Sequence, residues 1–386
     1  MKIDIADLAR VLAVCAGEAA ESPAELAALA RKGQPSCAAT LFSAWETAGE
    51  PLGAVLRAEL DAARSRIDFY RAVAARVLSE TDGLTAVKGL EVAALYPAGL
   101  VRYMNDLDYV ATRESDLWPA VTVLTADGWD LDTATFLMAG GRLHTTVSLR
   151  RPHEDRFQFP YGIELTSYYA LGDLSGVPPL LDLPDTWRAP AVKNLLMLLN
   201  ERHEQPFRAR DVIDAALLHD ALRGKEHDTL HAAVTKRGLV SEYAELRRLV
   251  SAGGLGALPA PPGGAWTAAR ARAVRLARSA RSLSKPVTGT ARHLQRRLVM
   301  GTIGRGGRAS WTALERRMDV ARALEGGLLA FGLPLDGPRP GVKAAELHSD
   351  GKTAWMDTPA GRFLLTIGDE VAESAVAELS AQPVHG

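Results

Sequence analysis

The sequence is short of cysteine and of long apolar runs, and each shortage excludes a class of protein. Only Cys15 and Cys37 occur among 386 residues, too few for a disulfide framework, which favours a reducing, cytoplasmic setting. No apolar run approaches the roughly 20 residues that span a bilayer. The acidic, amphipathic opening MKIDIADLAR lacks the apolar segment of a secretory signal. We therefore expect a cytoplasmic protein without a membrane-spanning segment.

Lysine is also scarce, although the bulk composition is ordinary. The chain has 9 lysines against 36 arginines, a net charge of −1, 47% hydrophobic and 24% charged residues. These proportions are typical of globular proteins, and the length favours two or three domains. Because arginine is otherwise preferred, a lysine at a motif position is consistent with a need for a compact ammonium group.

Changes of pattern along the chain predict an α+β fold. Residues 81–187 alternate as β-α-β-α-β-β-β, which favours a mixed β-sheet core. The full division is 1–80, a helical N-terminal region; 81–187, the core; 188–250, a helical domain; 251–264, a linker rich in Gly, Ala and Pro; 265–335, a basic helical region; and 340–386, a small β-meander with a C-terminal helix.

Local patterns place the individual elements. Ser22-Pro23-Ala24-Glu25 is a capping-box pattern that opens a helix, and further helices are expected over 51–80 and 114–127. Two more helices in 188–222 are interrupted near Gln205-Pro206. Apolar runs and turn residues predict strands at Leu84–Val87, Leu107–Ala111, Trp129–Leu137, Arg142–Leu149, Gly162–Tyr168, Ala345–His348, Thr353–Asp357 and Arg362–Ile367.

Two aspartates stand one residue apart in the stretch RYMNDLDYV, residues 102–110. If this stretch is extended, Asp106 and Asp108 project from one face about 7 Å apart, and Leu107 projects from the other. Two carboxylates that close repel each other unless a proton or a cation lies between them. Oxygen ligands on a rigid strand suit Mg²⁺. The pair is either a metal clamp or two solvated acids on a strand.

A third carboxylate, Glu164, lies in an apolar strand between Ile163 and Leu165. An acid in this position either points into a site or pairs with a surface arginine. Three carboxylates from two strands can hold two metal ions, one activating a hydroxyl for attack on an α-phosphorus and one stabilising the leaving pyrophosphate.

The order of these motifs resembles the uncharacterised nucleotidyltransferase family of bacterial gene clusters, within the polymerase-beta-like superfamily. That family shows a strand ending in Lys-Gly, then Tyr-Pro, an Arg, and Asp-x-Asp followed by apolar residues. The matching positions here are Lys88-Gly89, Tyr96-Pro97, Arg102, Asp106-Leu107-Asp108 and, further on, Glu164.

The segment 193–218, KNLLMLLNERHEQPFRARDVIDAALL, is similar to the helical part of AbiEii/MenT-type nucleotidyltransferases. In those proteins a helix-borne Lys is followed by Arg-Asp before an apolar helix. Lys193, Arg210 and Asp211 stand at the matching positions. The two resemblances together cover about residues 84–222.

The resemblance implies a nucleotidyltransferase-fold core that uses two Mg²⁺ ions and an NTP donor. It assigns Asp106, Asp108 and Glu164 to catalysis and metal binding. It assigns the nucleotide to Lys88, Gly89, Arg102, Lys193 and Asp211. One departure is that Lys88-Gly89 replaces the usual Gly-Ser, although a lysine beside a helix N-terminus also forms an anion site.

Three of these assignments have plain structural alternatives. Lys88 and Arg102 either bind the triphosphate or pair with a carboxylate. Lys193 is expected to support the nucleotide from the helical domain. Asp211 either contributes to the site or is a helix-opening acid, since negative charge is favoured in a first turn.

The acceptor is a separate question. The family's occurrence in biosynthetic clusters implies a hydroxyl or phosphate acceptor on a small molecule or peptide. The stretch 251–310 has no Asp or Glu, and 270–308 holds eleven Arg or Lys, so it is either a solvated or docked helix face or a surface for a phosphate backbone. The resemblance to AbiEii/MenT-type proteins, which act on tRNA ends, implies tRNA as the partner of such a surface. Alternatives are therefore a toxin-like enzyme acting on tRNA, an enzyme that nucleotidylates proteins, and an inactive nucleotide-binding module.

Overall fold

The computed structural model describes residues 1–170, 179–202, 206–260, 320–339, 341–351, 353–367 and 376. Most of the expected basic helical region, including the arginine-rich 270–308, lies outside these residues. So does nearly all of the C-terminal helix expected after the last strand.

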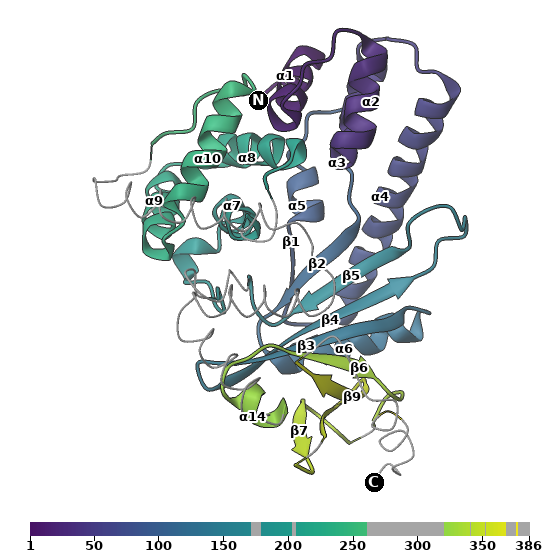
Figure 1. Ribbon diagram of the computed structural model, residues 1–386, viewed down its shortest axis with the longest axis vertical. Coiled ribbons are helices and arrows are strands. Elements are labelled where there is room, and N and C mark those ends of the chain that lie inside the picture. Colours follow the sequence, from purple (N-terminus) through teal and green to yellow (C-terminus); the bar gives the residue numbers. More distant parts are fainter. Residues whose placement is uncertain are drawn as a thin grey trace, which may run out of the picture.

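Four helices precede the sheet: α1 (Ile5–Ala16), α2 (Pro23–Gly33), α3 (Pro35–Thr47) and α4 (Ala54–Glu80). The expected helix start at Ser22 is confirmed, because the Ser22 hydroxyl accepts the Glu25 N–H at 3.3 Å and Pro23 occupies the first helical position. The Glu25 carboxylate accepts the Glu21 N–H at 2.8 Å, one residue before the position that a full capping box requires. The long helix α4 buries one side against the strands, including Ile67, Tyr70 and Val77. This helix forms the support behind the sheet (Figure 1).

Within the described residues, nine strands form one mixed sheet in the order β1-β2-β5-β4-β3-β6-β9-β8-β7. Strands β2 and β5 pair in parallel, and the other neighbours pair antiparallel. The mixed α/β architecture is thus confirmed. The strands are β1 (Leu84–Val87), β2 (Asp106–Ala111), β3 (Asp130–Ala139), β4 (Arg142–Arg151), β5 (Tyr161–Thr166), β6 (Ala330–Pro334), β7 (Glu346–Ser349), β8 (Ala354–Thr358) and β9 (Gly361–Thr366).

The C-terminal strands continue the central sheet. Strand β6, which lies in a segment expected to be helical, pairs with β3 on one side and β9 on the other. At this junction the rings of Phe136 and Phe363 meet edge to face, with centroids 5.8 Å apart. A Cβ on Gly332 would lie 2.8 Å from the Phe136 ring, so glycine permits the close approach.

The two faces of the sheet have different neighbours. Helices α4 and α6 (Glu114–Ala126) contact one face, where Leu107, Tyr109 and Leu165 are buried in the main core. Beside the opposite face lie α7 (Pro190–Glu201), α8 (Ala209–Ala221), α9 (Glu226–Arg237) and α10 (Val240–Ala252) (Figure 1). The one-turn helix α5 (Gly89–Ala93) lies between β1 and this group, and η1 (Asp185–Trp187) and α14 (Val320–Glu325) complete the described elements.

None of the helices in the described part of the chain combines the length and the apolar character needed to cross a bilayer.

Candidate active site

Three carboxylates project from one face of the sheet. Asp108 on β2 is the register partner of Glu164 on β5, and Asp106 pairs with Gly162 in the same parallel ladder. Because side chains alternate along a strand, Asp106 shares the face of Asp108, and Leu107, 3% exposed, enters the core on the other side. The expected extended Asp-x-Asp unit is therefore present.

These carboxylates line a cavity of about 470 Å³ between the sheet and helices α5, α7 and α8. Of the expected site residues, seven line it: Lys88, Gly89, Arg102, Asp106, Asp108, Glu164 and Asp211. The lining also includes Asn194, Glu201, Arg208, Arg210 and Asp214 from α7, α8 and the residue before α8. The cavity is thus strongly polar, with acids on its sheet wall and both signs of charge on its helical wall.

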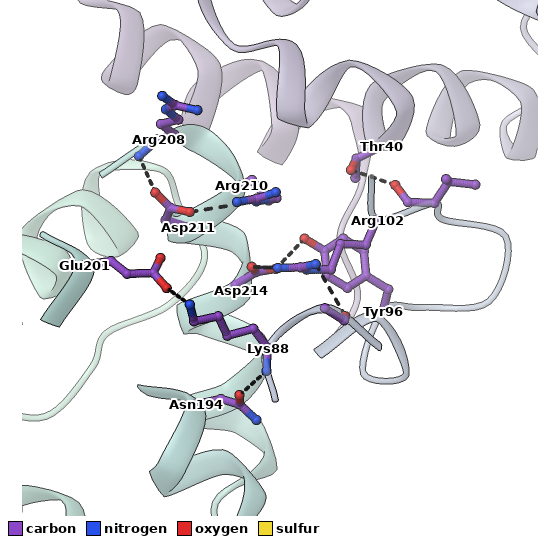
Figure 2. Close-up of polar contacts among 12 residues, drawn as sticks. Thr40, Lys88, Tyr96, Arg102, Asn194, Glu201, Arg208, Arg210, Asp211 and Asp214 are labelled. Carbon is purple, nitrogen blue, oxygen red and sulfur yellow. Dashed lines mark hydrogen bonds and ion pairs between the residues drawn. The ribbon is translucent and has the colours of Figure 1, made fainter. Parts of the chain in front are cut away.

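The Lys88 ammonium reaches into the acidic part of the cavity. Its nitrogen lies 2.5 Å from a Glu201 oxygen (Figure 2). An Asp108 oxygen lies 3.9 Å from the same nitrogen. Burial opposes the charge, but the carboxylates of Asp108 and Glu201 outweigh it and raise the pKa of Lys88 well above its usual value. The cavity therefore contains a fixed positive charge.

Crowding among the acids changes the protonation of Asp108. Burial, followed by the like charges of Asp106, Glu164 and Glu201, raises the pKa of Asp108 to about 7, although Lys88 opposes the shift. An added cation would relieve this repulsion. A carboxyl group in this state binds either a proton or a cation near neutral pH.

The backbone at Lys88 is strained. Its φ of 52° and ψ of −115° lie in a region that residues with a Cβ rarely adopt, at a cost of about 1–3 kcal/mol. No other non-glycine residue in the described ranges has a positive φ. At the next position, a Cβ on Gly89 would lie 3.2 Å from the Met104 sulfur. Since α5 has only five residues, its contribution to anion binding through a helix dipole is small.

Arg102 is held by a buried acid. Its guanidinium donates to both carboxylate oxygens of Asp214 of α8, from Nε at 2.9 and 3.1 Å and from Nη2 at 2.7 Å. The Tyr96 hydroxyl donates to the same carboxylate at 2.7 Å (Figure 2). The side chains of Arg102 and Asp214 are 6% and 5% exposed. Of the two roles expected for Arg102, triphosphate binding and pairing with a carboxylate, the structure contains the carboxylate pairing. This pairing occupies much of the hydrogen-bond donor capacity of Arg102.

Lys193 does not line the cavity. Its ammonium lies 2.9 Å from Glu91 of α5 and donates to the Ala86 carbonyl at 3.3 Å, and the residue is 3% exposed. The next residue, Asn194, donates to Glu91 at 2.8 Å. The side chain of Lys193 thus fixes the β1–α5 turn, and these contacts give no support to direct nucleotide binding.

Asp211 caps the helix that it opens. Its side chain accepts the Arg208 N–H at 2.8 Å, and the Arg210 guanidinium lies 3.9 Å away (Figure 2). Burial raises the pKa of Asp211 to about 6 against the opposing charge of Arg210. The helix-opening role is therefore present, at a position that also lines the cavity.

Sequence reasoning missed Glu201, Asn194 and Asp214. Asn194 and Glu201 are seven residues apart on α7, which is two helical turns and therefore one face. The spacing in the sequence indicates that both side chains lie on one face of the helix. It does not indicate that both contact Lys88. Asp214 gave the pattern Asp-x-x-Asp with Asp211, which also occurs on solvated helix faces.

Comparison of the chain with models of protein families, with curated proteins and with solved structures gives no match. Within the residues that the structure describes, no three His, Cys, Asp or Glu side chains are gathered closely enough to hold a metal ion as they stand.

Proposed function

We propose that the protein is a divalent-metal-dependent nucleotidyltransferase that transfers a nucleoside monophosphate from an NTP to a hydroxyl or phosphate acceptor. The observation that carries this proposal is the direct pairing of Asp108 with Glu164 on parallel strands, with Asp106 on the same face of one cavity. A polymerase-beta-like nucleotidyltransferase core is the corresponding proposal for the fold.

The donor set fits a divalent cation in its chemistry. Three carboxylates face a shared cavity, and the pKa of Asp108 is raised by burial and by its acidic neighbours, which is the electrostatic state that a hard cation relieves. Asp106, Asp108 and Glu164 would hold the ions. When bound, Mg²⁺ supplies charge neutralisation for the triphosphate and the departing pyrophosphate.

The cations of the cavity bind the phosphates in this proposal. Lys88, Arg208 and Arg210 line the cavity from the β1–α5 turn and the start of α8. The Lys88 ammonium lies beside Glu201, and the Arg210 guanidinium lies beside Asp211 (Figure 2). Glu164 accepts the proton of the attacking hydroxyl. Arg102 and Lys193, which are held by Asp214 and Glu91, position the surrounding segments.

The first experiment asks whether the cavity binds nucleotide at all. Thermal unfolding is measured with each of the four NTPs and MgCl₂, and a preferred NTP at 100 times its Kd should stabilise the protein by about 2.7 kcal/mol. The double substitution Asp106→Asn and Asp108→Asn should abolish this stabilisation. Asp132→Asn, a strand aspartate paired with Arg150 on the surface, is the matched control. Equal stabilisation of the double variant and the control would refute the proposal.

The second experiment identifies the acceptor class. The protein is incubated with α-³²P-labelled NTPs, alone, with total tRNA, or with a small-molecule extract. We expect label on a small-molecule acceptor. Acid-precipitable RNA label would favour the tRNA alternative, in which 270–308 binds the acceptor, and label on a polypeptide band would favour protein nucleotidylation.

A further inference from the structure

Helix α7 contacts Lys88 at both ends. The Asn194 side-chain oxygen accepts the Lys88 backbone N–H at 2.6 Å, and Glu201 binds the Lys88 ammonium at 2.5 Å. The two α7 residues are separated by seven positions, which is about 10.5 Å along one helix face. Lys88 therefore spans two turns of α7, with its peptide at one turn and its charge at the other (Figure 2).

The contact at the backbone end falls on the strained peptide. Lys88 has a φ of 52°, and such a conformation persists only where neighbours impose it. Asn194 supplies the acceptor for its N–H, and Lys193 and Asn194 together bind Glu91 of α5. Consecutive α7 residues thus hold both sides of the turn that carries Lys88.

The orientation of the Asn194 amide is fixed by its other partners. Its nitrogen donates to Glu91 at 2.8 Å and to the Pro190 carbonyl at 2.9 Å. A flipped amide would place its oxygen against a carboxylate and a carbonyl, which both only accept. The acceptor atom must therefore face the Lys88 N–H, and Asn194, 2% exposed, has its donors and its acceptor in use.

We infer that Asn194 is a positioning residue, which fixes the strained Lys88 peptide so that the ammonium is presented to the phosphates of the ligand. Glu201 anchors the ammonium from the other end. The inference rests on the proposed function for the identity of the ligand, but the geometry of Lys88 is testable without it. Loss of the Asn194 acceptor frees the peptide to return to a negative φ, and this turns the Lys88 side chain away from the cavity.

The main test is a double-mutant cycle with inorganic tripolyphosphate and MgCl₂, measured by isothermal titration calorimetry. Asn194→Ala should weaken binding about tenfold or more in the native background, and it should cause no further loss in a Lys88→Met background, because the two residues act through one contact. Asn200→Ala, which removes another buried α7 amide bonded to its own helix, is the control for lost helix hydrogen bonding in thermal unfolding. Additive losses in the cycle would overturn the inference.

A second test uses strain and does not depend on a ligand. Glycine adopts a positive φ freely, so Asn194→Ala should lower Tm less in a Lys88→Gly background than in a Lys88→Met background. If Asn194→Ala alone does not fold, the pair with Lys88→Gly should still do so. Equal losses of Tm in both backgrounds would contradict an imposed conformation.

A third measurement follows the ammonium itself. With ¹⁵N-labelled lysine there are nine side chains to assign, and Lys88→Met identifies the signal of Lys88. Asn194→Ala should shift or broaden this signal, whereas an unchanged signal would overturn the inference. If the native protein binds no tripolyphosphate with MgCl₂ but the Lys88 signal still depends on Asn194, the proposed function fails and the positioning role stands.

Discussion

Asp108 is the residue at which the electrostatics of the cavity concentrate. Burial and three neighbouring carboxylates hold its pKa at about 7, against a usual value of 3.8. The folded protein therefore binds this proton more tightly than the unfolded chain does. The contribution of Asp108 to the free energy of unfolding is fully present below pH 3.8 and is lost as the pH rises through about 7.

We expect Asp108→Asn to stabilise the protein at pH 8 and to abolish the proposed metal binding. In EDTA, the free energy of unfolding from urea titration should rise by about 1–4 kcal/mol relative to the native protein. The gain should disappear at pH 4, where the native carboxyl is protonated as well. An equal change at both pH values would show that the effect is not electrostatic.

The affinity for a divalent cation should depend on the protonation of Asp108. If Asp108 is a metal ligand, as proposed, Mn²⁺ and the proton compete for it, and the Kd for Mn²⁺ should fall about tenfold per pH unit between pH 5 and 7 and level off above pH 7. Calorimetric titration across this range measures the curve. A flat profile through pH 7 would place the cation elsewhere, and Asp132→Asn is the control that should leave the curve unchanged.

At the scale of elements, a buried ion pair joins the segment after α5 to helix α8. Arg102 and Asp214 are both almost fully buried, and Tyr96 adds a third partner. Removing one member of such a pair leaves the other charge without compensation. The two elements that form the back of the cavity therefore depend on each other for their position.

Arg102→Met should lower the free energy of unfolding by about 3–5 kcal/mol, measured by urea titration. Arg113 pairs with Asp116, and the Arg113 side chain is 75% exposed. Arg113→Met should therefore lower the free energy of unfolding by about 1 kcal/mol or less. If Arg102 served only a ligand, its loss would leave the stability of the free protein unchanged.

The local pattern of apolar residues predicted the helices and strands better than it predicted the contacts between them. Alternating apolar residues gave β2 and β5 and the common face of Asp106 and Asp108, because periodicity records burial. It did not give the Arg102–Asp214 pair, which joins positions 112 apart. It also failed at β6, where the pairing with β3 depends on Gly332 fitting between two rings. The nucleotide and metal roles stay predictions.

At the scale of the whole molecule, one sheet joins the carboxylate strands to the C-terminal strands through β3 and β6. Gly332 lies at this junction with Phe136 and Phe363 in close contact. The C-terminal strands are therefore coupled to the wall of the cavity, since Thr135 of β3 lines it and pairs with Phe331 of β6.

Gly332→Ala should destabilise the protein by about 1–3 kcal/mol through overpacking. Gly337→Ala, where a Cβ meets nothing within 4 Å, should change stability by less than about 0.5 kcal/mol. Urea titration measures both. Similar values for the two variants would argue against tight packing at the β3–β6 junction.

The parallel pairing of β2 with β5 also has a kinetic consequence. Asp108 and Glu164 are 56 positions apart, and two antiparallel strands and a helix intervene before β5 can join β2. Contacts between residues so far apart in the sequence form late in folding, because the chain loses the entropy of loop closure before these contacts can stabilise it. The proposed cation binding should therefore appear after most helical signal has returned during refolding, and it would then mark the completed sheet.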